Sequence, residues 1–309
     1  MEELRGRVAF ITGGASGIGL GIARALIAEG MRVAVADLRR DALRGAVQTL
    51  AAEGSQALAV ELDVRDRAAW IRASEQVSRE LGPVQVLCSN AGVNFVGPTH
   101  RATAEDWEFC LSVNLGGAIN AVQTFVPRMI EHAAGAHIVI TSSVSGLFTS
   151  GGAGCYVTSK FALVGLAESL RADLAGEGIG VSVLCPGPVQ SELFESTIAV
   201  RPASLAATGS IPVIAPGVRR EDTPIFATAP NGLEIGRRVV LGIRRNDLYI
   251  LTHPEIRPVL EARAAALAAL LPDEPVAPSR VQASEQLLST ALYASEIAKR
   301  PPKAAPRGS

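Results

Sequence analysis

The chain has 309 residues, 48 % of them hydrophobic and 19 % charged, a composition that excludes an intrinsically disordered protein. Its 29 lysines and arginines nearly balance 30 aspartates and glutamates, so the net charge of -1 does not favour nucleic acid as a partner. The acidic start and the lack of an apolar run of about 18 residues argue against a secretory signal and a membrane partner. We therefore expect a cytoplasmic globular protein.

The first 190 residues alternate short apolar runs with longer stretches at helical spacing. This alternation is typical of parallel strands joined by helices on both faces of the sheet. We predict a Rossmann-like, doubly wound α/β fold of about seven parallel strands, with ligand crevices beyond the carboxyl ends of the strands. The predicted strands are residues 7–12, 32–37, 57–62, 84–89, 137–142, 180–184 and 247–251.

The regular pattern ends after Pro186. Residues 201–230 are rich in Pro, Gly, Ser, Thr and Ala, which disfavours helix, and we predict a substrate loop or lid at about 191–230. Helical patterns follow at 231–244, 255–271 and 279–299, and the basic, proline-rich residues 300–309 are predicted to be a flexible tail. We expect one Rossmann-fold domain at 1–300, with a core at 1–190 and C-terminal helices at 231–299.

A glycine-rich turn, Thr12-Gly13-Gly14-Ala15-Ser16-Gly17-Ile18-Gly19, follows the first predicted strand and opens a helix. Its glycines would let the backbone approach a pyrophosphate, which the free amides of a helix N-terminus attract. Asp37 ends the next strand, where its carboxylate can accept hydrogen bonds from adenosine-ribose hydroxyls and would repel a 2′-phosphate, although a helix N-cap is an alternative interpretation. We expect NAD as cofactor, with NADP less favoured; Arg39 and Arg40 could pair with a phosphate and keep NADP open.

Tyr156 and Lys160 lie four positions apart, so they share one face of a helix. A tyrosine that acts near neutrality needs a pKa about three pH units below 10, which corresponds to about 4 kcal/mol. A lysine charge at about 4 Å supplies on the order of 4 kcal/mol at an effective dielectric near 20. Ser143, predicted to follow a strand, can hydrogen-bond the same substrate oxygen. The pattern predicts that Tyr156 exchanges a proton with an alcohol or carbonyl while a hydride moves to or from the dinucleotide.

These motifs, in this order, resemble those of the short-chain dehydrogenase/reductase family, whose glycine pattern is Thr-Gly-x3-Gly-x-Gly. The resemblance implies that Asn114 binds a water linking Lys160 to solvent and that Lys160 also holds the nicotinamide ribose. It further implies an adenine contact by Asp63. The family often has a threonine where Ser191 stands. The predicted catalytic residues are Asn114, Ser143, Tyr156 and Lys160, and the predicted cofactor-binding residues are Gly13, Ser16, Gly17, Ile18, Gly19, Asp37, Asp63, Val64, Asn90, Ala91, Gly92, Tyr156, Lys160, Pro186, Gly187, Val189 and Ser191.

Residues 92–98, 124–130, 248–251 and 254–257 resemble bacterial benzylic alcohol dehydrogenases that oxidise the Cα hydroxyl of lignin-derived aryl ethers. Apolar residues predicted near Tyr156 favour a bulky hydrophobic or aromatic alcohol or ketone. For Phe148 and Phe194, a place in the hydrophobic core is an equally open alternative. The predicted substrate contacts are Asn94, Ser145, Phe148, Cys155, Leu193 and Phe194.

Two alternatives stay open: a dehydratase or epimerase that retains its cofactor, and a non-catalytic cofactor-binding regulatory or scaffold protein on the same fold. The four histidines show no metal-ligand spacing, so we infer no metal. The cysteines are scattered; we assign Cys88, Cys110 and Cys185 to the core and Cys155 to the site. By resemblance, we expect a homodimer or homotetramer built through helices near 105–130 and 160–175.

Overall fold

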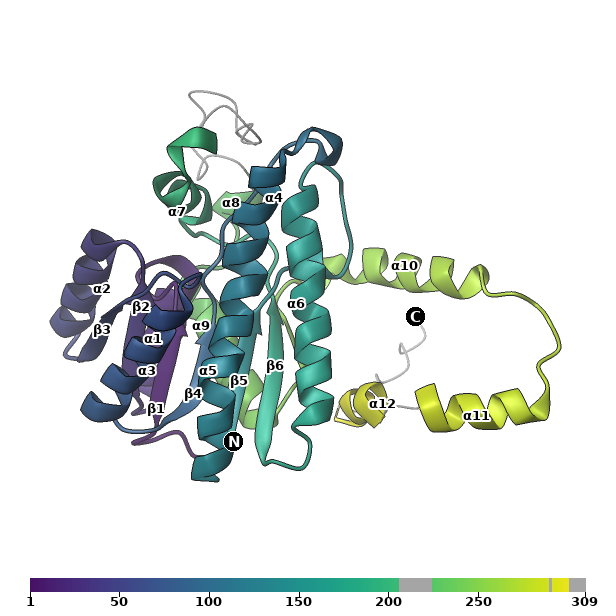
Figure 1. Cartoon of the computed structure of the whole chain (residues 1–309), viewed down its shortest axis with the longest axis horizontal. Helices are drawn as coiled ribbons and strands as arrows, with labels where there is room; N and C mark the ends of the chain where they lie inside the picture. The colour runs from purple at the N-terminus through teal and green to yellow at the C-terminus, as the bar shows by residue number, and fades with distance from the viewer. Residues whose placement is uncertain (206–223, 289–290, 300–309) are drawn as a thin grey trace, which may run out of the picture. The chain divides into compact units, whose positions relative to one another are not determined.

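The computed structural model describes residues 1–205, 224–288 and 291–299 (Figure 1). The chain divides into two compact units, Met1–Ile256 and Arg257–Ser309. The second unit contains the helices α10 (Arg257–Ala269), α11 (Pro278–Leu288) and α12 (Ala291–Ala298). The predicted helix at 279–299 falls on α11 and α12, and the predicted tail at 300–309 lies outside the described residues. One domain over residues 1–300 stays a prediction.

The first unit is built on a seven-stranded sheet in the order β3-β2-β1-β4-β5-β6-β7, in which every neighbouring pair is parallel. The predicted doubly wound α/β fold is confirmed. The strand order reverses between β1 and β4, where such folds open a ligand crevice at the carboxyl ends of the strands. The strands are β1 (Val8–Thr12), β2 (Arg32–Asp37), β3 (Ala57–Glu61), β4 (Val84–Ser89), β5 (Ala136–Thr141), β6 (Ile179–Cys185) and β7 (Tyr249–Leu251).

Helices cover both faces of this sheet, and each face has its own hydrophobic core. One core lies under α1 (Gly17–Ala28), α2 (Arg40–Ala52) and α9 (Gly232–Arg245). The other lies under α3 (Arg67–Glu80), α4 (Ala104–Leu111), α5 (Gly117–His132) and α6 (Gly154–Asp173). At its centre the rings of Phe10, Trp70 and Phe125 pack with centroids 5.0–6.2 Å apart. Burial on both faces explains why β1, β5 and β6 read as continuous apolar runs.

A π-helical turn, Ser112–Gly116, joins α4 to α5, so that the helix runs on from Ala104 to His132. By length and composition this helix could cross a membrane, but half of its most apolar window is buried inside the protein. Such burial is what the core helix of a folded domain shows. The turn also carries Asn114, and π-helical turns recur at functional sites.

The segment predicted as a loop at 191–230 is in part helical. Residues Leu193–Val200 form helix α7, because this segment contains neither proline nor glycine. A second short helix, α8 (Pro224–Ala227), follows residues 206–223, which lie outside the described residues. The Thr197 hydroxyl of α7 accepts a hydrogen bond of 2.9 Å from the backbone N–H of Asn94. Just beyond α7, the buried Arg201 guanidinium contacts the Asp106 carboxylate at 2.6 Å. These contacts fasten α7 to the loop after β4 and to the start of α4.

Candidate active site

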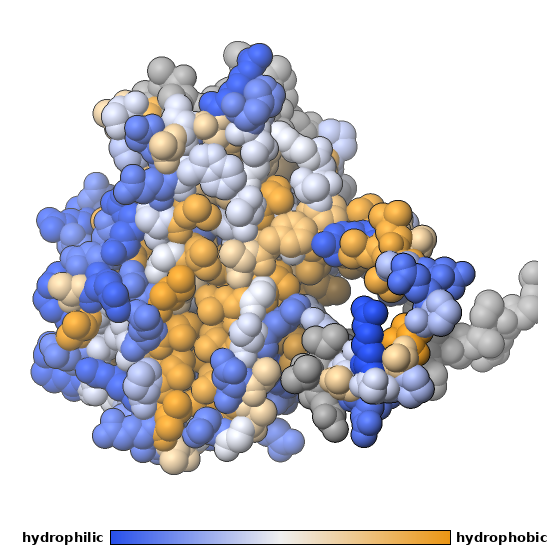
Figure 2. Space-filling model, turned by 45° about the vertical axis from the view of Figure 1, so that its right-hand side comes forward, coloured by the Kyte–Doolittle hydropathy of each residue, from blue (hydrophilic) through white to orange (hydrophobic). Residues whose placement is uncertain are grey.

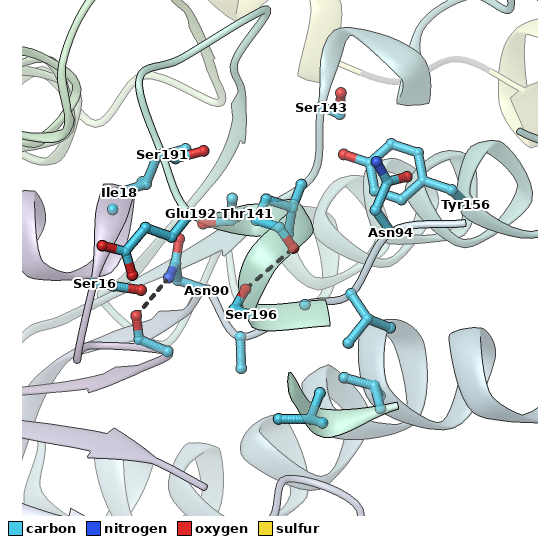
Figure 3. Close-up of a pocket in the computed structure, with 18 of the residues that line it drawn as sticks. Ser16, Ile18, Asn90, Asn94, Thr141, Ser143, Tyr156, Ser191, Glu192 and Ser196 are labelled. Carbon is cyan, nitrogen blue, oxygen red and sulfur yellow. Dashed lines mark hydrogen bonds between the residues drawn. The ribbon is translucent and has the colours of Figure 1, made fainter. Parts of the chain in front are cut away.

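A pocket of about 380 Å³ lies at the carboxyl ends of the strands, lined by the residues that follow β1 to β6 (Figure 3). Figure 3 shows the glycine-turn residues Ser16 and Ile18 at one end of the view, and Ser143 and Tyr156 at the other. The pocket is therefore elongated between the first βα turn and the start of α6. Of the predicted cofactor-binding residues, all except Gly19 line it: Gly13, Ser16, Gly17, Ile18, Asp37, Asp63, Val64, Asn90, Ala91, Gly92, Tyr156, Lys160, Pro186, Gly187, Val189 and Ser191.

The glycine turn is held against the end of β4 by hydrogen bonds. The Thr12 hydroxyl accepts from the backbone N–H groups of Asn90 and Ala91, at 2.9 and 3.0 Å. In return, the Asn90 side chain donates to the carbonyl of Thr12 at 3.1 Å. Gly13 adopts a φ of +62°, and a Cβ there would lie 3.0 Å from the backbone of Ala91. Only glycine combines that left-handed backbone with so close an approach.

Gly19 does not line the pocket, and its role is packing. A Cβ at Gly19 would lie 2.1 Å from the carbonyl oxygen of Gly13. The glycine therefore allows α1 to begin directly against the turn, with its N-terminal amides facing the pocket. The glycine turn and the N-terminus of α1 thus fit a phosphate group, although Gly19 supports the turn by packing and does not line the pocket.

Asp37, at the end of β2, is bound by Arg39, whose Nε lies 3.1 Å from one carboxylate oxygen. The same guanidinium donates to the Ser16 hydroxyl at 3.0 Å, so it bridges the end of β2 to the glycine turn. Arg40 instead pairs with Glu61. Of the two arginines that the sequence singled out, only Arg39 lines the pocket.

Asp63, just after β3, forms a bidentate pair with Arg65, with contacts of 2.7–3.2 Å. The Arg65 hydrogen bonds hold the pKa of the Asp63 carboxyl below its usual range. The carbonyl of the next residue, Val64, accepts from the indole N–H of Trp70 and from the side chain of Asn120. Our sequence prediction missed Arg65, because nothing in its spacing distinguishes it from other surface arginines.

Three of the predicted catalytic side chains converge at the far end of the pocket. Tyr156 lies in the first turn of α6, and Ser143 follows β5; both side chains line the pocket at the same end of the view in Figure 3. Lys160, one helical turn beyond Tyr156, places its Nζ 5.4 Å from the centre of the tyrosine ring and donates to the carbonyl of Thr141 at 3.0 Å. The neighbouring Ser142, which also lines the pocket, donates its hydroxyl hydrogen to the Lys160 carbonyl at 2.7 Å.

Burial shifts the pKa values of both groups. It raises the pKa of Tyr156 to about 12, against a smaller opposite effect of the Ser143 hydrogen bond. It lowers the pKa of Lys160 to about 8. Desolvation of the phenolate is the largest cause of the raised Tyr156 pKa, and it acts against the lowering that the sequence predicts from the Lys160 charge.

Lys160→Met should reduce the rise in the free energy of unfolding between pH 8 and pH 10.5. Between pH 8 and 10.5 an unfolded lysine keeps its proton whereas folded Lys160 has released it, so Lys160 makes the free energy of unfolding rise with pH across this window. Above pH 10 Tyr156 has the opposite effect, because the folded protein keeps the phenolic proton up to about pH 12. Urea unfolding without dinucleotide at several pH values should show a smaller rise in Lys160→Met than in the parent, whereas the control Lys299→Met on α12 should keep the parent's slope.

Asn114, the fourth predicted catalytic residue, lies behind the pocket. Its Oδ1 accepts from the Val93 N–H at 2.8 Å, and its Nδ2 donates to the Val93 carbonyl and the Ser159 hydroxyl. A Cβ on Gly92 would lie 3.2 Å from Asn114 Oδ1 and 3.5 Å from Lys160 Nζ, so both atoms face the same glycine. Asn114 thus fixes the loop after β4 next to Lys160; the water between them stays a prediction.

The structure brings half of the predicted substrate residues to the pocket. Asn94, Ser145 and Leu193 line it. Cys155 does not: it is fully buried and packs in a small hydrophobic cluster with Phe95 and Cys110. Phe148 and Phe194 are also absent from the described lining, whereas our prediction missed Phe109, Val113, Ser196, Val200 and Phe226, which do line it.

The residues present fit a nicotinamide dinucleotide. Gly13, Gly17 and Gly92 line the pocket and bring its backbone walls close together, the N-terminus of α1 would supply amides for a pyrophosphate, and the carboxylate of Asp37, which also lines the pocket, could accept hydrogen bonds from a ribose. The opposite end brings a phenol and an ammonium group together under a mostly apolar wall. The arrangement can hold a dinucleotide beside a small hydroxyl- or carbonyl-bearing molecule and transfer a proton to or from it.

Comparison with known proteins gives a consistent result. The family model described as short chain dehydrogenase matches residues 7–201. A Cα-dehydrogenase of Sphingobium is 38 % identical over 273 residues, which cover 86 % of this chain and 87 % of the relative. Among solved structures, a short-chain dehydrogenase of Novosphingobium aromaticivorans superposes with a TM-score of 0.81 at 34 % identity, covering 97 % of this chain and 100 % of that one. A short-chain dehydrogenase/reductase of Burkholderia phymatum in complex with NAD gives a TM-score of 0.80 at 32 % identity, covering 90 % and 100 %.

Proposed function

Since the chain belongs to the short-chain dehydrogenase/reductase family of oxidoreductases, we propose that it interconverts a secondary alcohol and a ketone, with Tyr156 as the general acid and base. The observation that carries this proposal is the convergence of Tyr156, Ser143 and Lys160 at one end of a pocket whose other end is a glycine turn. A non-catalytic cofactor-binding protein would not need that convergence.

Each of these side chains has a separate task. When bound, the nicotinamide dinucleotide accepts or donates the hydride. In alcohol oxidation, the oxygen of the Tyr156 phenolate would take the proton of the substrate hydroxyl and become the phenol, while the Ser143 hydroxyl orients the same substrate oxygen. The Lys160 ammonium, held by the Thr141 carbonyl, stabilises the phenolate electrostatically. Asn114 keeps the neighbouring backbone in place.

We propose a bulky hydrophobic or aromatic substrate. The pocket lining includes the apolar residues Phe109, Val113, Leu193, Val200 and Phe226 and the polar groups of Asn94, Ser145 and Ser196. Apolar pockets with few polar groups favour such ligands over sugars.

A panel of aryl and alicyclic secondary alcohols and ketones tests this proposal. Turnover is followed by nicotinamide absorbance, with NAD and NADP in parallel. We expect kcat/KM to be highest for an aryl alcohol or ketone with NAD. Absence of turnover across the panel, by a protein that binds the dinucleotide, would favour the regulatory or scaffold alternative.

We propose that NAD is preferred over NADP. Asp37 ends β2 and lines the pocket, and its carboxylate would repel the 2′-phosphate of an adenosine ribose bound beside it. Asp37→Asn should raise the ratio of kcat/KM for NADP to that for NAD by about tenfold or more, since it removes a like-charge contact and frees Arg39 to pair with a phosphate. Glu61→Gln, which affects only the neighbouring pair with Arg40, is the matched control and should leave the ratio unchanged. Equal ratios in the parent and Asp37→Asn would contradict this assignment.

We propose assembly into a homodimer or homotetramer through α5 and α6. Ile119 and Ile130 on α5 are more than a third exposed, and Leu166 and Leu170 on α6 are only partly buried. Figure 2 shows an apolar band over this face of the molecule. A second copy of the chain would remove that apolar surface from water.

A cytoplasmic location of the protein stays a prediction.

A further inference from the structure

Resting on the proposed function, we propose that His253 is a positioning residue that holds the backbone of Pro186–Val189 in the shape required by the dinucleotide. It lies outside the pocket lining and has no place in the proton transfer. Yet it is buried, with 6 % of its surface exposed, and both of its ring nitrogens are engaged.

The sheet register brings His253 to this loop. Cys185, the last residue of β6, pairs with Leu251, the last residue of β7. Gly187 and His253 each follow two residues later, at the same edge of the parallel sheet. The short segment after β7 therefore runs beside the segment after β6, whose residues line the pocket.

The hydrogen bonds of the imidazole fix its tautomer and clamp the loop on two sides. The backbone N–H of Gly187 donates to Nδ1 at 3.0 Å, so the other ring nitrogen carries the proton. Nε2 lies 2.9 Å from the Pro188 carbonyl and donates to it. The Thr252 hydroxyl lies 2.6 Å from Nδ1 and also donates to it. One neutral ring thus binds the backbone of two successive loop residues.

The glycine at 187 is matched to this ring. A Cβ on Gly187 would lie 2.7 Å from Cγ and 2.9 Å from both Cδ2 and Nδ1 of His253. The ring therefore stacks directly on the loop backbone. On the other side, the carbonyl of Pro186 accepts from the backbone N–H of Val144 at 2.9 Å and from the Ser143 hydroxyl at 3.4 Å. The loop is held between His253 and the strand end that carries a catalytic serine.

Four variants test the proposal with NAD as the probe. We expect His253→Ala to raise the Kd and KM for NAD by about tenfold, because two loop hydrogen bonds are lost, while kcat at saturating NAD falls much less. His253→Asn keeps an acceptor near Nδ1, and His253→Gln keeps a donor near Nε2, so each should give about a threefold rise. The control is His137→Ala, a buried histidine on β5 that bonds Ser182 at 2.8 Å; it should lower the Tm without changing the Kd.

A double-variant cycle tests the contact itself. Gly187→Ala should lower the Tm in the parent, because the added Cβ meets the ring, and should lower it less in the His253→Ala background. Equal losses in both backgrounds would overturn the contact. An unchanged Kd in His253→Ala, or an equal rise in His137→Ala, would overturn the positioning role. If the parent protein itself fails to bind NAD, the proposed function is overturned. The proposal that Pro186–Val189 is shaped for the dinucleotide is then overturned as well.

Discussion

Tyr156→Phe is expected to lower kcat for alcohol oxidation by about 10²–10⁴-fold, the typical contribution of a positioned general acid or base. The substitution removes only the phenolic oxygen of Tyr156, a residue that lines the pocket. The ring that packs below the Lys160 ammonium stays in place, so the Kd for NAD should change little. Steady-state kinetics, together with a separate binding titration, distinguish the two effects.

Tyr249→Phe is the matched control. Its hydroxyl bonds Glu168 at 2.6 Å outside the pocket lining, so its loss should leave kcat near the parent's value. Alcohol oxidation by Tyr156→Phe at the parent's rate would contradict the proton transfer assigned to Tyr156. A loss of NAD binding equal to the loss of turnover would instead make Tyr156 a binding residue.

Asp106→Ala is expected to lower the free energy of unfolding by about 3–5 kcal/mol, because it leaves the Arg201 guanidinium buried without its charge partner. The Asp106 side chain is fully buried, and that of Arg201 is 6 % exposed. Asp106 also closes the capping box of α4, by accepting from the Thr103 N–H at 3.0 Å. Urea unfolding followed by circular dichroism measures the loss.

Glu105→Ala, at an exposed neighbouring position of α4, is the control and should change the stability little. The double variant Asp106→Ala with Arg201→Met should recover part of the loss, since an apolar side chain in place of the guanidinium no longer needs a charge partner. If Asp106→Ala is no less stable than Glu105→Ala, the pair does not fasten α7.

Much of the site is visible in the sequence because its spacing is local. The turn Thr12–Gly19 and the pair Tyr156 and Lys160 each lie within one turn or helix, where residue type and separation dictate the geometry. The same holds for the residues that end each strand, because parallel strands place all their carboxyl ends at one edge. The pocket therefore contains nearly every predicted cofactor-binding residue.

Adjacent residues show where that local reasoning stops. Cys155 precedes Tyr156, yet successive helix residues point about 100° apart, and the sulfur lies in a core with Phe95 and Cys110. Leu193 lines the pocket, but its neighbour Phe194 is not in the described lining. Which way a side chain faces depends on how the helix is rotated against its neighbours, and this rotation is set by packing across the whole domain.

The sequence by itself determined the seven strands in chain order, the glycine turn and the pair Tyr156 and Lys160, since each depends on backbone preference or short spacing. Only the tertiary structure joined Arg39 to Ser16, Arg201 to Asp106 and His253 to Gly187, contacts that span 23, 95 and 66 positions. Such contacts form when the fold brings distant strand ends and helix ends together, and no residue pattern along the chain records which of them will meet.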